Sequence, residues 1–218
     1  GYFLYNAYDG FEYIGNPDLR SEKSNFFKAN LQYTQSKLKI NFSQSYSLIH
    51  DYILGINQTD IPVMSFYARG IRMYKNLKEA SVYSSDLQVL YAPTANFSTF
   101  LISKYVSGKI GRTENMPLIA PFRNILAAKY ENKKITFQAE CESAFSQKKI
   151  NTAYGETITP GFVVFNTKAG YRTTLKTIGL YAGIGINNLL NRVYYEHLDW
   201  GKINRPGRNA EVYLKFEL

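Results

Sequence analysis

The sequence predicts an all-β fold, and within that class a portion of an antiparallel transmembrane β-barrel with about ten strands. The 19 Tyr and 14 Phe far outnumber the 3 Met and 1 Trp, and this aromatic bias suits pleated strands. Several segments alternate apolar and polar side chains with the period of two that a strand requires. Short and long connections alternate strictly along the chain, which is typical of outer-membrane barrels with short periplasmic turns and long extracellular loops.

The alternation is clearest between Ile135 and Phe145 and in the last nine residues, where one face is apolar and the other charged. The expected strands are residues 2–8, 25–34, 38–53, 81–92, 97–108, 122–130, 134–146, 161–172, 177–187 and 210–218. The short connections lie at 35–37, 93–96, 131–133 and 173–175, and the long ones at 9–24, 54–80, 109–121, 147–160 and 188–209.

A soluble β-sandwich or lipocalin-like barrel would alternate in the same way, so strand length and aromatic placement decide between the two classes. Segments 38–53 and 97–108 exceed the about 5–6 residues usual in globular sheets. Tyrosines recur towards the ends of the apolar faces, as membrane-interface girdles require, at Tyr33, Tyr46, Tyr83, Tyr91, Tyr130 and Tyr171. These features favour the membrane barrel.

In that barrel, apolar side chains such as Phe137, Leu180 and Val212 face lipid and polar ones line the lumen. The expected lumen residues are Lys28, Gln138, Glu140, Glu142, Lys168, Arg172, Glu211 and Lys215. A dry central interior built from the three apolar residues would contradict this orientation.

Composition excludes several other classes. The 218 residues fit one domain, and 45% hydrophobic content is too high for a disordered chain. The single Cys141 allows no internal disulfide framework or cysteine-based zinc site, and two His leave little for a histidine-rich metal site. No apolar run approaches the about 20 residues of a spanning helix. The basic residues behind the net charge of +9 are scattered between strands rather than gathered on one face, so we expect no nucleic-acid partner. We also expect no metal centre and no cofactor.

Four segments resemble TonB-dependent outer-membrane receptors, in the order in which that family has them. Asn16-Pro17-Asp18-Leu19 with Glu22 is similar to an Asn-Pro-x-Leu-x-x-Glu segment of the barrel. Residues 154–171 resemble the third-last strand and the loop before it. Residues 184–198, with Gly185, Asn188-Leu189 and Tyr194, resemble the penultimate strand. Pro206-Gly207-Arg208-Asn209 and the alternation after it resemble the last strand, although the family usually ends in an aromatic residue and this chain ends in Leu218.

The resemblance implies that residues 1–218 are the C-terminal portion of a plugged barrel of ~22 strands, without the plug and the first barrel half. It implies a bacterial outer-membrane, non-enzymatic importer of a scarce ligand, energised through TonB. A metal chelate such as a ferric siderophore is favoured. Haem is not, because no aromatic-Arg-Ala-Pro motif occurs at Leu4-Tyr5-Asn6-Ala7. The implied partners are lipid and lipopolysaccharide, the rest of the barrel and plug, the TonB complex through that plug, and the chelate.

Backbone chemistry leaves a second possibility open. An open sheet exposes two unpaired edges to hydrocarbon, at several kcal/mol for each unsatisfied group. Strands 2–8 and 210–218 would therefore pair with other protein, or with each other in a self-contained ten-stranded barrel. The latter would be a passive pore or a surface protease. A receptor-like scaffold of a surface complex is a further alternative.

The candidate ligand-binding residues lie in or near the long connections. Imidazoles ligate iron and copper, aromatic rings stack on flat chelates, and guanidinium groups attract anionic ones. These candidates are Tyr8, Tyr13, His50, Tyr194, Tyr195, His197, Arg205 and Arg208. Loop packing and solvation are the competing explanations for each of them. We expect no catalytic residues.

Overall fold

The computed structural model describes residues 3–7, 9–175 and 178–217 and is built almost entirely of strands. The strands are β1 (Phe3–Asn6), β2 (Phe11–Ile14), β3 (Lys23–Gln35), β4 (Leu38–Gln58), β5 (Ile71–Tyr91), β6 (Phe97–Ile110), β7 (Glu114–Asn115), β8 (Arg123–Glu131), β9 (Ile135–Ala144), β10 (Phe162–Leu175), β11 (Ile178–Asn187) and β12 (Asn209–Glu217). Two 3-10 turns, η1 (Thr152–Tyr154) and η2 (Trp200–Lys202), are too short to cross a membrane, and the described ranges contain no spanning helix.

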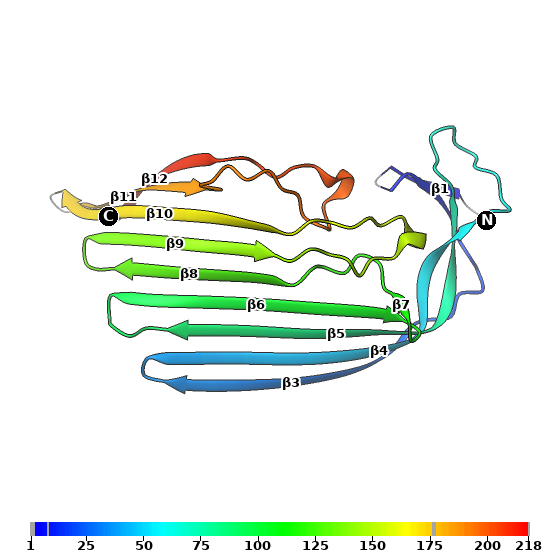
Figure 1. The fold of residues 1–218 in the computed structure, drawn as a ribbon, viewed down its shortest axis with the longest axis horizontal. Coiled ribbons are helices and arrows are strands. Elements are labelled where there is room, and N and C mark those ends of the chain that lie inside the picture. The colour runs from blue at the N-terminus through cyan, green and yellow to red at the C-terminus, as the bar shows by residue number, and fades with distance from the viewer. Residues whose placement is uncertain (1–2, 8, 176–177, 218) are drawn as a thin grey trace.

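The long strands form one antiparallel row in the order β3, β4, β5, β6, β8, β9, β10, β11 and β12. Figure 1 shows the tight connections gathered at one end of this row and the long ones at the other. We call these the turn end and the loop end. The predicted all-β class, the antiparallel meander and the alternation of short and long connections are thereby confirmed.

The prediction that residues 2–8 form the first strand of this row was wrong. β1 instead pairs with β2 as a short hairpin, and β2 lies parallel to β5. The turn follows from Asp9-Gly10: Gly10 has φ +75°, and the Asp9 carboxylate accepts the N–H of Phe11 at 3.0 Å. The edges of the row are therefore β3 and β12, and among the described residues these two do not pair with each other.

The strand register gives the row one apolar face, because paired residues point to the same side. Phe137 pairs with Tyr130 on one side and Ala169 on the other, for example. The face is lined by Leu31, Phe42, Leu87, Leu101, Leu126, Phe137, Phe165, Leu180, Val212 and Phe216. The opposite face carries all the expected lumen residues. Val212 is 75% exposed and Phe137 49%, so they form no dry interior.

Aromatic rings mark both ends of the apolar face. On or next to β5, β6, β8 and β9 they occur in pairs eight residues apart, namely Tyr83 and Tyr91, Phe97 and Tyr105, Phe122 and Tyr130, and Phe137 and Phe145. At the loop end the rings touch in sequence, with centroids 6.2 Å apart for Tyr83–Tyr105, 6.3 Å for Tyr105–Phe122 and 5.2 Å for Phe122–Phe145. We call these the loop-end row and the others the turn-end row. At about 3.3 Å per residue the two rows are ~26 Å apart along the strand.

Beyond the loop-end row, β4 and β5 bend towards the N-terminal hairpin (Figure 1). Asp51 takes φ +54° at the bend, and its carbonyl accepts a hydrogen bond from Asn76 Nδ2 at 2.6 Å. The segment 16–22 crosses here: Asn76 also binds the Arg20 backbone, and Glu22 accepts the N–H of Ile53 at 2.6 Å. β4 and β5 thus continue into the expected loop 54–80 and shorten it to 59–70.

Candidate functional site

The long loops meet around a cavity of about 740 Å³ at the loop end. Its walls come from the N-terminal hairpin, the 59–70 loop and the start of β5, the 145–161 loop, the 188–208 loop and Leu118 of the segment between β7 and β8. Ionic and aromatic side chains dominate the lining: Tyr5, Asp9, Phe11, Tyr67, Arg69, Arg72, Tyr154, Glu156, His197, Asp199 and Lys202. This mixture of cations, carboxylates and rings suits a polar ligand that also has flat or apolar parts.

Arg72 joins three segments of the cavity wall and is only 1% exposed. Its Nη1 donates to Asp9 Oδ2 and to Tyr13 Oη, both at 3.0 Å, and its Nη2 donates to the Tyr154 carbonyl at 2.6 Å. Its Nε donates to Asn57 Oδ1 at 3.0 Å. Burial of a guanidinium is tolerated only with such full pairing.

Two rings complete the surroundings of Arg72. The guanidinium carbon lies 3.8 Å from the ring centroid of Phe11 and 4.0 Å from that of Tyr154, so the cation is sandwiched between aromatic faces. Gly155 follows Tyr154 with φ +88°, a conformation that favours glycine and ends η1 beside Arg72. Arg72 therefore fixes the N-terminal hairpin against the 145–161 loop.

Glu12 holds the 59–70 loop in place. It is 1% exposed, and its carboxylate accepts the backbone N–H groups of Met64 at 2.7 Å and Ser65 at 2.6 Å. These hydrogen bonds from Met64 and Ser65 lower the pKa of Glu12 from its ordinary value. In the neighbouring residue Tyr13, burial and the hydrogen bond to Asp9 raise the pKa of the phenol. Both side chains are structural supports of the cavity wall.

Glu156 connects three loops through one carboxylate. Its Oε1 accepts the N–H of Leu118 at 2.7 Å and lies 3.2 Å from His197 Nε2, while its Oε2 accepts the N–H of Asn151 at 2.8 Å. The other ring nitrogen of His197 lies 2.9 Å from Thr159 Oγ1. A proton on Nε2 lets the ring donate to Glu156, and the Thr159 hydroxyl, which can donate or accept, suits Nδ1.

Acid should loosen this three-loop junction. Burial opposes charge on Glu156, but the hydrogen bonds from His197, Asn151 and Leu118 outweigh it and lower its pKa below the ordinary 4.5. Its contribution to stability is therefore complete above about pH 4.5 and is lost as the pH falls through the lower folded-state pKa. We expect hydrogen exchange at the Leu118 and Asn151 amides to accelerate at least about tenfold in that acid range, relative to intrinsic rates.

The matched variants separate the two loop carboxylates. Glu156→Gln should accelerate exchange at Leu118 and Asn151 already at pH 7 and remove the acid step. Glu12→Gln should instead affect the amides of Met64 and Ser65. Equal effects of both variants at all four amides would contradict separate junctions.

The remaining loop charges form a network at the surface, which touches the cavity wall only at Asp199. Arg205 makes a two-pronged ion pair with Asp199, at 2.6 and 2.8 Å, and approaches Glu196 at 3.4 Å. This hydrogen bond with Asp199 raises the pKa of Arg205. Glu196 also pairs with Arg123 at 3.1 Å, which ties the last long loop to β8.

The structure separates the eight residues singled out in the sequence. His197 lines the cavity, and Tyr13 supports its wall through Arg72. Tyr195 lies with its ring 5.7 Å from the Lys202 ammonium, whereas Tyr194 packs on Phe162 at 4.3 Å between ring centroids.

The others lie elsewhere. His50 lies within β4, opposite Lys23 of β3 and Glu79 of β5 in the strand register. Arg208 is exposed. Neither lines the cavity. Tyr8 lies outside the described residues. Ligand contact by any of the eight stays a prediction.

The family-like segments have structural roles at the last loop. Asn188 takes φ +51° at the end of β11 and is 5% exposed. Its side chain exchanges hydrogen bonds with the Arg192 backbone and donates to the Pro206 carbonyl at 3.2 Å. Asn191 Oδ1 accepts the N–H of Arg208 at 2.8 Å. The Asn-Leu and Pro-Gly-Arg-Asn segments thus clasp the two ends of one loop.

In the part of the chain that the structure describes, no group of three or more His, Cys, Asp or Glu side chains is arranged to hold a metal ion.

Solved structures of similar fold include metal transporters and a receptor. The copper transporter OprC matches with a TM-score of 0.76 and 22% identity, over 92% of this chain and 31% of its own. The FrpB iron transporter of Neisseria meningitidis matches at 0.69 and 14%, over 93% and 32%. BauA, the ferric preacinetobactin receptor of Acinetobacter baumannii, matches at 0.69 and 12%, over 89% and 29%.

These similarities bear on the fold. The chain spans about a third of the length of each of the three structures and has the fold of the corresponding part of a TonB-dependent receptor. The sequence-based expectation of that fold is confirmed. No family model matches the sequence, and no curated protein matches it either.

Proposed function

We propose that this chain is the C-terminal barrel portion of a TonB-dependent outer-membrane receptor that imports a metal chelate without covalent chemistry. The observation that supports the proposal most is the single apolar face, bounded by two aromatic rows, on a sheet whose solved counterparts include a copper transporter and a ferric preacinetobactin receptor. Each strand segment from one aromatic row to the other, such as Tyr83 to Tyr91, contains nine residues when both ends are counted. About nine residues is the shortest length with which a tilted strand spans the hydrocarbon layer.

The two faces of the sheet then have different surroundings. The apolar face contacts lipid, and the polar face lines a lumen that contains the plug. Glu140, hydrogen-bonded to Asn166 at 3.0 Å, and Lys168, paired with Glu211 at 3.4 Å, are hydrated or plug-facing there. β3 and β12 pair with further barrel strands, because unpaired backbone groups in hydrocarbon are costly.

The cavity at the loop end is the proposed entrance for the ligand. Arg69 and Lys202 offer positive charge to an anionic chelate, and Tyr67 offers a ring for stacking. Arg72 holds the hairpin and the 145–161 loop in position, so capture does not require folding of these segments.

Uptake measurements test the proposal. A strain that depends on this protein should accumulate radiolabelled iron supplied as a ferric catecholate or a ferric hydroxamate, or radiolabelled copper, and deletion of the gene should abolish accumulation of at least one of them. Removal of TonB should abolish the same uptake, because import against a gradient needs energy. Uptake that persists without TonB would identify a passive pore. If deletion left the accumulation of all three probes unchanged, the protein would not be an importer of them, and the scaffold alternative would be favoured.

A further inference from the structure

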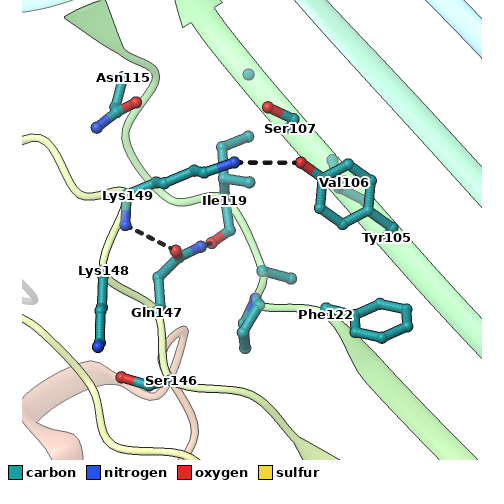
Figure 2. A pocket seen from close by; sticks show the side chains of 13 residues that line it. Tyr105, Val106, Ser107, Asn115, Ile119, Phe122, Ser146, Gln147, Lys148 and Lys149 are labelled. Atoms are coloured by element: carbon teal, nitrogen blue, oxygen red, sulfur yellow. Dashed lines mark hydrogen bonds between the residues drawn. The ribbon is translucent and has the colours of Figure 1, made fainter.

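A second hollow lies outside the cavity. It lies at the loop end, where β6 extends further than its neighbour β8, which begins at Arg123. Figure 2 shows it between β6, the segment 119–122 and the segment 146–149. Its volume is about 280 Å³. Tyr105 and Phe122, two members of the loop-end row, border it on the apolar face. We call it the rim pocket.

The rim pocket presents two adjacent lysines on a fixed segment. Gln147 is 7% exposed; its Nε2 donates to the Ile119 carbonyl at 2.7 Å and its Oε1 accepts the Lys149 N–H at 3.1 Å. Lys149 Nζ points at Tyr105 Oη (Figure 2) and lies 3.4 Å from it. The ammonium retains donors for a further partner. The side chain of Lys148 is exposed.

An apolar groove of about 680 Å³ adjoins the rim pocket along the sheet. Phe145, Val163 and Phe165 of the apolar face line it, together with Leu190 and Arg192 from the start of the last loop. Leu190 is 65% exposed and Phe145 59%. Both hollows include Ser146, and the Phe122 and Phe145 rings touch between them, so they form one continuous surface.

The charges and the apolar area point to one kind of occupant. Lys148, Lys149 and Arg192 belong to the lining, which contains no Asp or Glu. These cations lie at the loop end of the apolar face, beside the aromatic row that marks its limit. A free anion would contact the cations but leave the apolar groove empty, and a hydrocarbon chain alone would fill the groove but leave the cations without an anionic partner.

We propose that the rim pocket and the groove together bind a phosphorylated lipid of the outer leaflet. Its phosphate contacts Lys148, Lys149 and Arg192, and an acyl chain lies along Phe145, Val163 and Phe165. The inference rests on the proposed membrane placement of the sheet and adds a site on its outer surface, away from the ligand cavity.

Native mass spectrometry of the whole purified protein in detergent tests this site. The probes are bisphosphorylated lipid A, the same lipid without phosphates, and inorganic phosphate. The double variant Lys148→Gln/Lys149→Gln should bind the bisphosphorylated lipid at least about tenfold more weakly than wild type. Lys133→Gln/Lys134→Gln is the matched control, because it removes two adjacent exposed lysines at the turn end and should bind normally.

Three outcomes would overturn the site: equal lipid affinity in both double variants, equal binding of the lipid without phosphates, or inorganic phosphate bound as tightly as the lipid. Arg192→Gln gives an independent weakening if the lysine variant assembles poorly. The uptake assay reports separately on the proposed function, so normal TonB-dependent uptake with no lipid phosphate bound would refute only this inference.

Discussion

Replacement of Arg72 by alanine should release the N-terminal hairpin from the loop end. The Asp9 side chain, 8% exposed, would lose its cation, and the rings of Phe11 and Tyr154 would lose the group between them. Breaking a buried pair from one side costs roughly 3–5 kcal/mol. Backbone hydrogen exchange in β2 and η1 should therefore accelerate by about a hundredfold or more, while the strands from β8 to β11 keep their protection.

Two further substitutions identify the cause of this effect. Arg69→Ala removes an exposed arginine of the same cavity and should leave exchange in β2 and η1 nearly unchanged. Arg72→Lys keeps the charge but loses the planar fork and should restore only part of the protection. If Arg72→Ala were no worse than Arg69→Ala, the hairpin would be held by other contacts, and the cavity wall would have to be explained without the cation sandwich.

The period-two alternation predicted the faces of the sheet well, for a physical reason. A strand has one side-chain period, and pairing transmits it to the neighbour, so Phe137 and Val212 could be assigned to the same side from the sequence alone. The alternation of short and long connections gave the antiparallel order in the same way. The N-terminal hairpin was missed because 2–8 alternates like any strand, although Asp9-Gly10 is a strong turn signal.

The ionic junctions of the cavity could not be predicted from sequence. Arg72 is one of many loop cations in the sequence, and nothing local marks it as buried. Its partners at 9, 57 and 154 are distant in sequence and meet only because β4 and β5 bend at Asp51. Glu156 is equally inconspicuous. Sequence reasoning singled out His197, because histidine is rare in this chain, but it did not identify Glu156 as the residue that His197 contacts.

Substitution of Leu87 by arginine should damage the protein strongly if the apolar face lies in the membrane. Leu87 lies on that face, four residues from Tyr83 of the loop-end row and four from Tyr91 of the turn-end row, and therefore at the middle of the spanning segment. An arginine at the midplane of a membrane barrel costs about 2–4 kcal/mol. We expect Leu87→Arg to lower the free energy of unfolding by that amount, measured by urea unfolding of the whole protein in phospholipid vesicles.

Two controls separate the effect of membrane depth from a general intolerance of charge. Gln88→Arg changes the next residue, on the polar face beside Asp86, and should be nearly neutral. Ser81→Arg lies on the apolar face of the same strand, but two residues beyond Tyr83 and past the loop-end row, where the cost should fall to about 0–1 kcal/mol. Thinner bilayers should reduce the cost at Leu87 and leave the other two unchanged. A soluble core would penalise Leu87→Arg equally in every lipid, so a cost independent of bilayer thickness would contradict the lipid-facing orientation on which the importer depends.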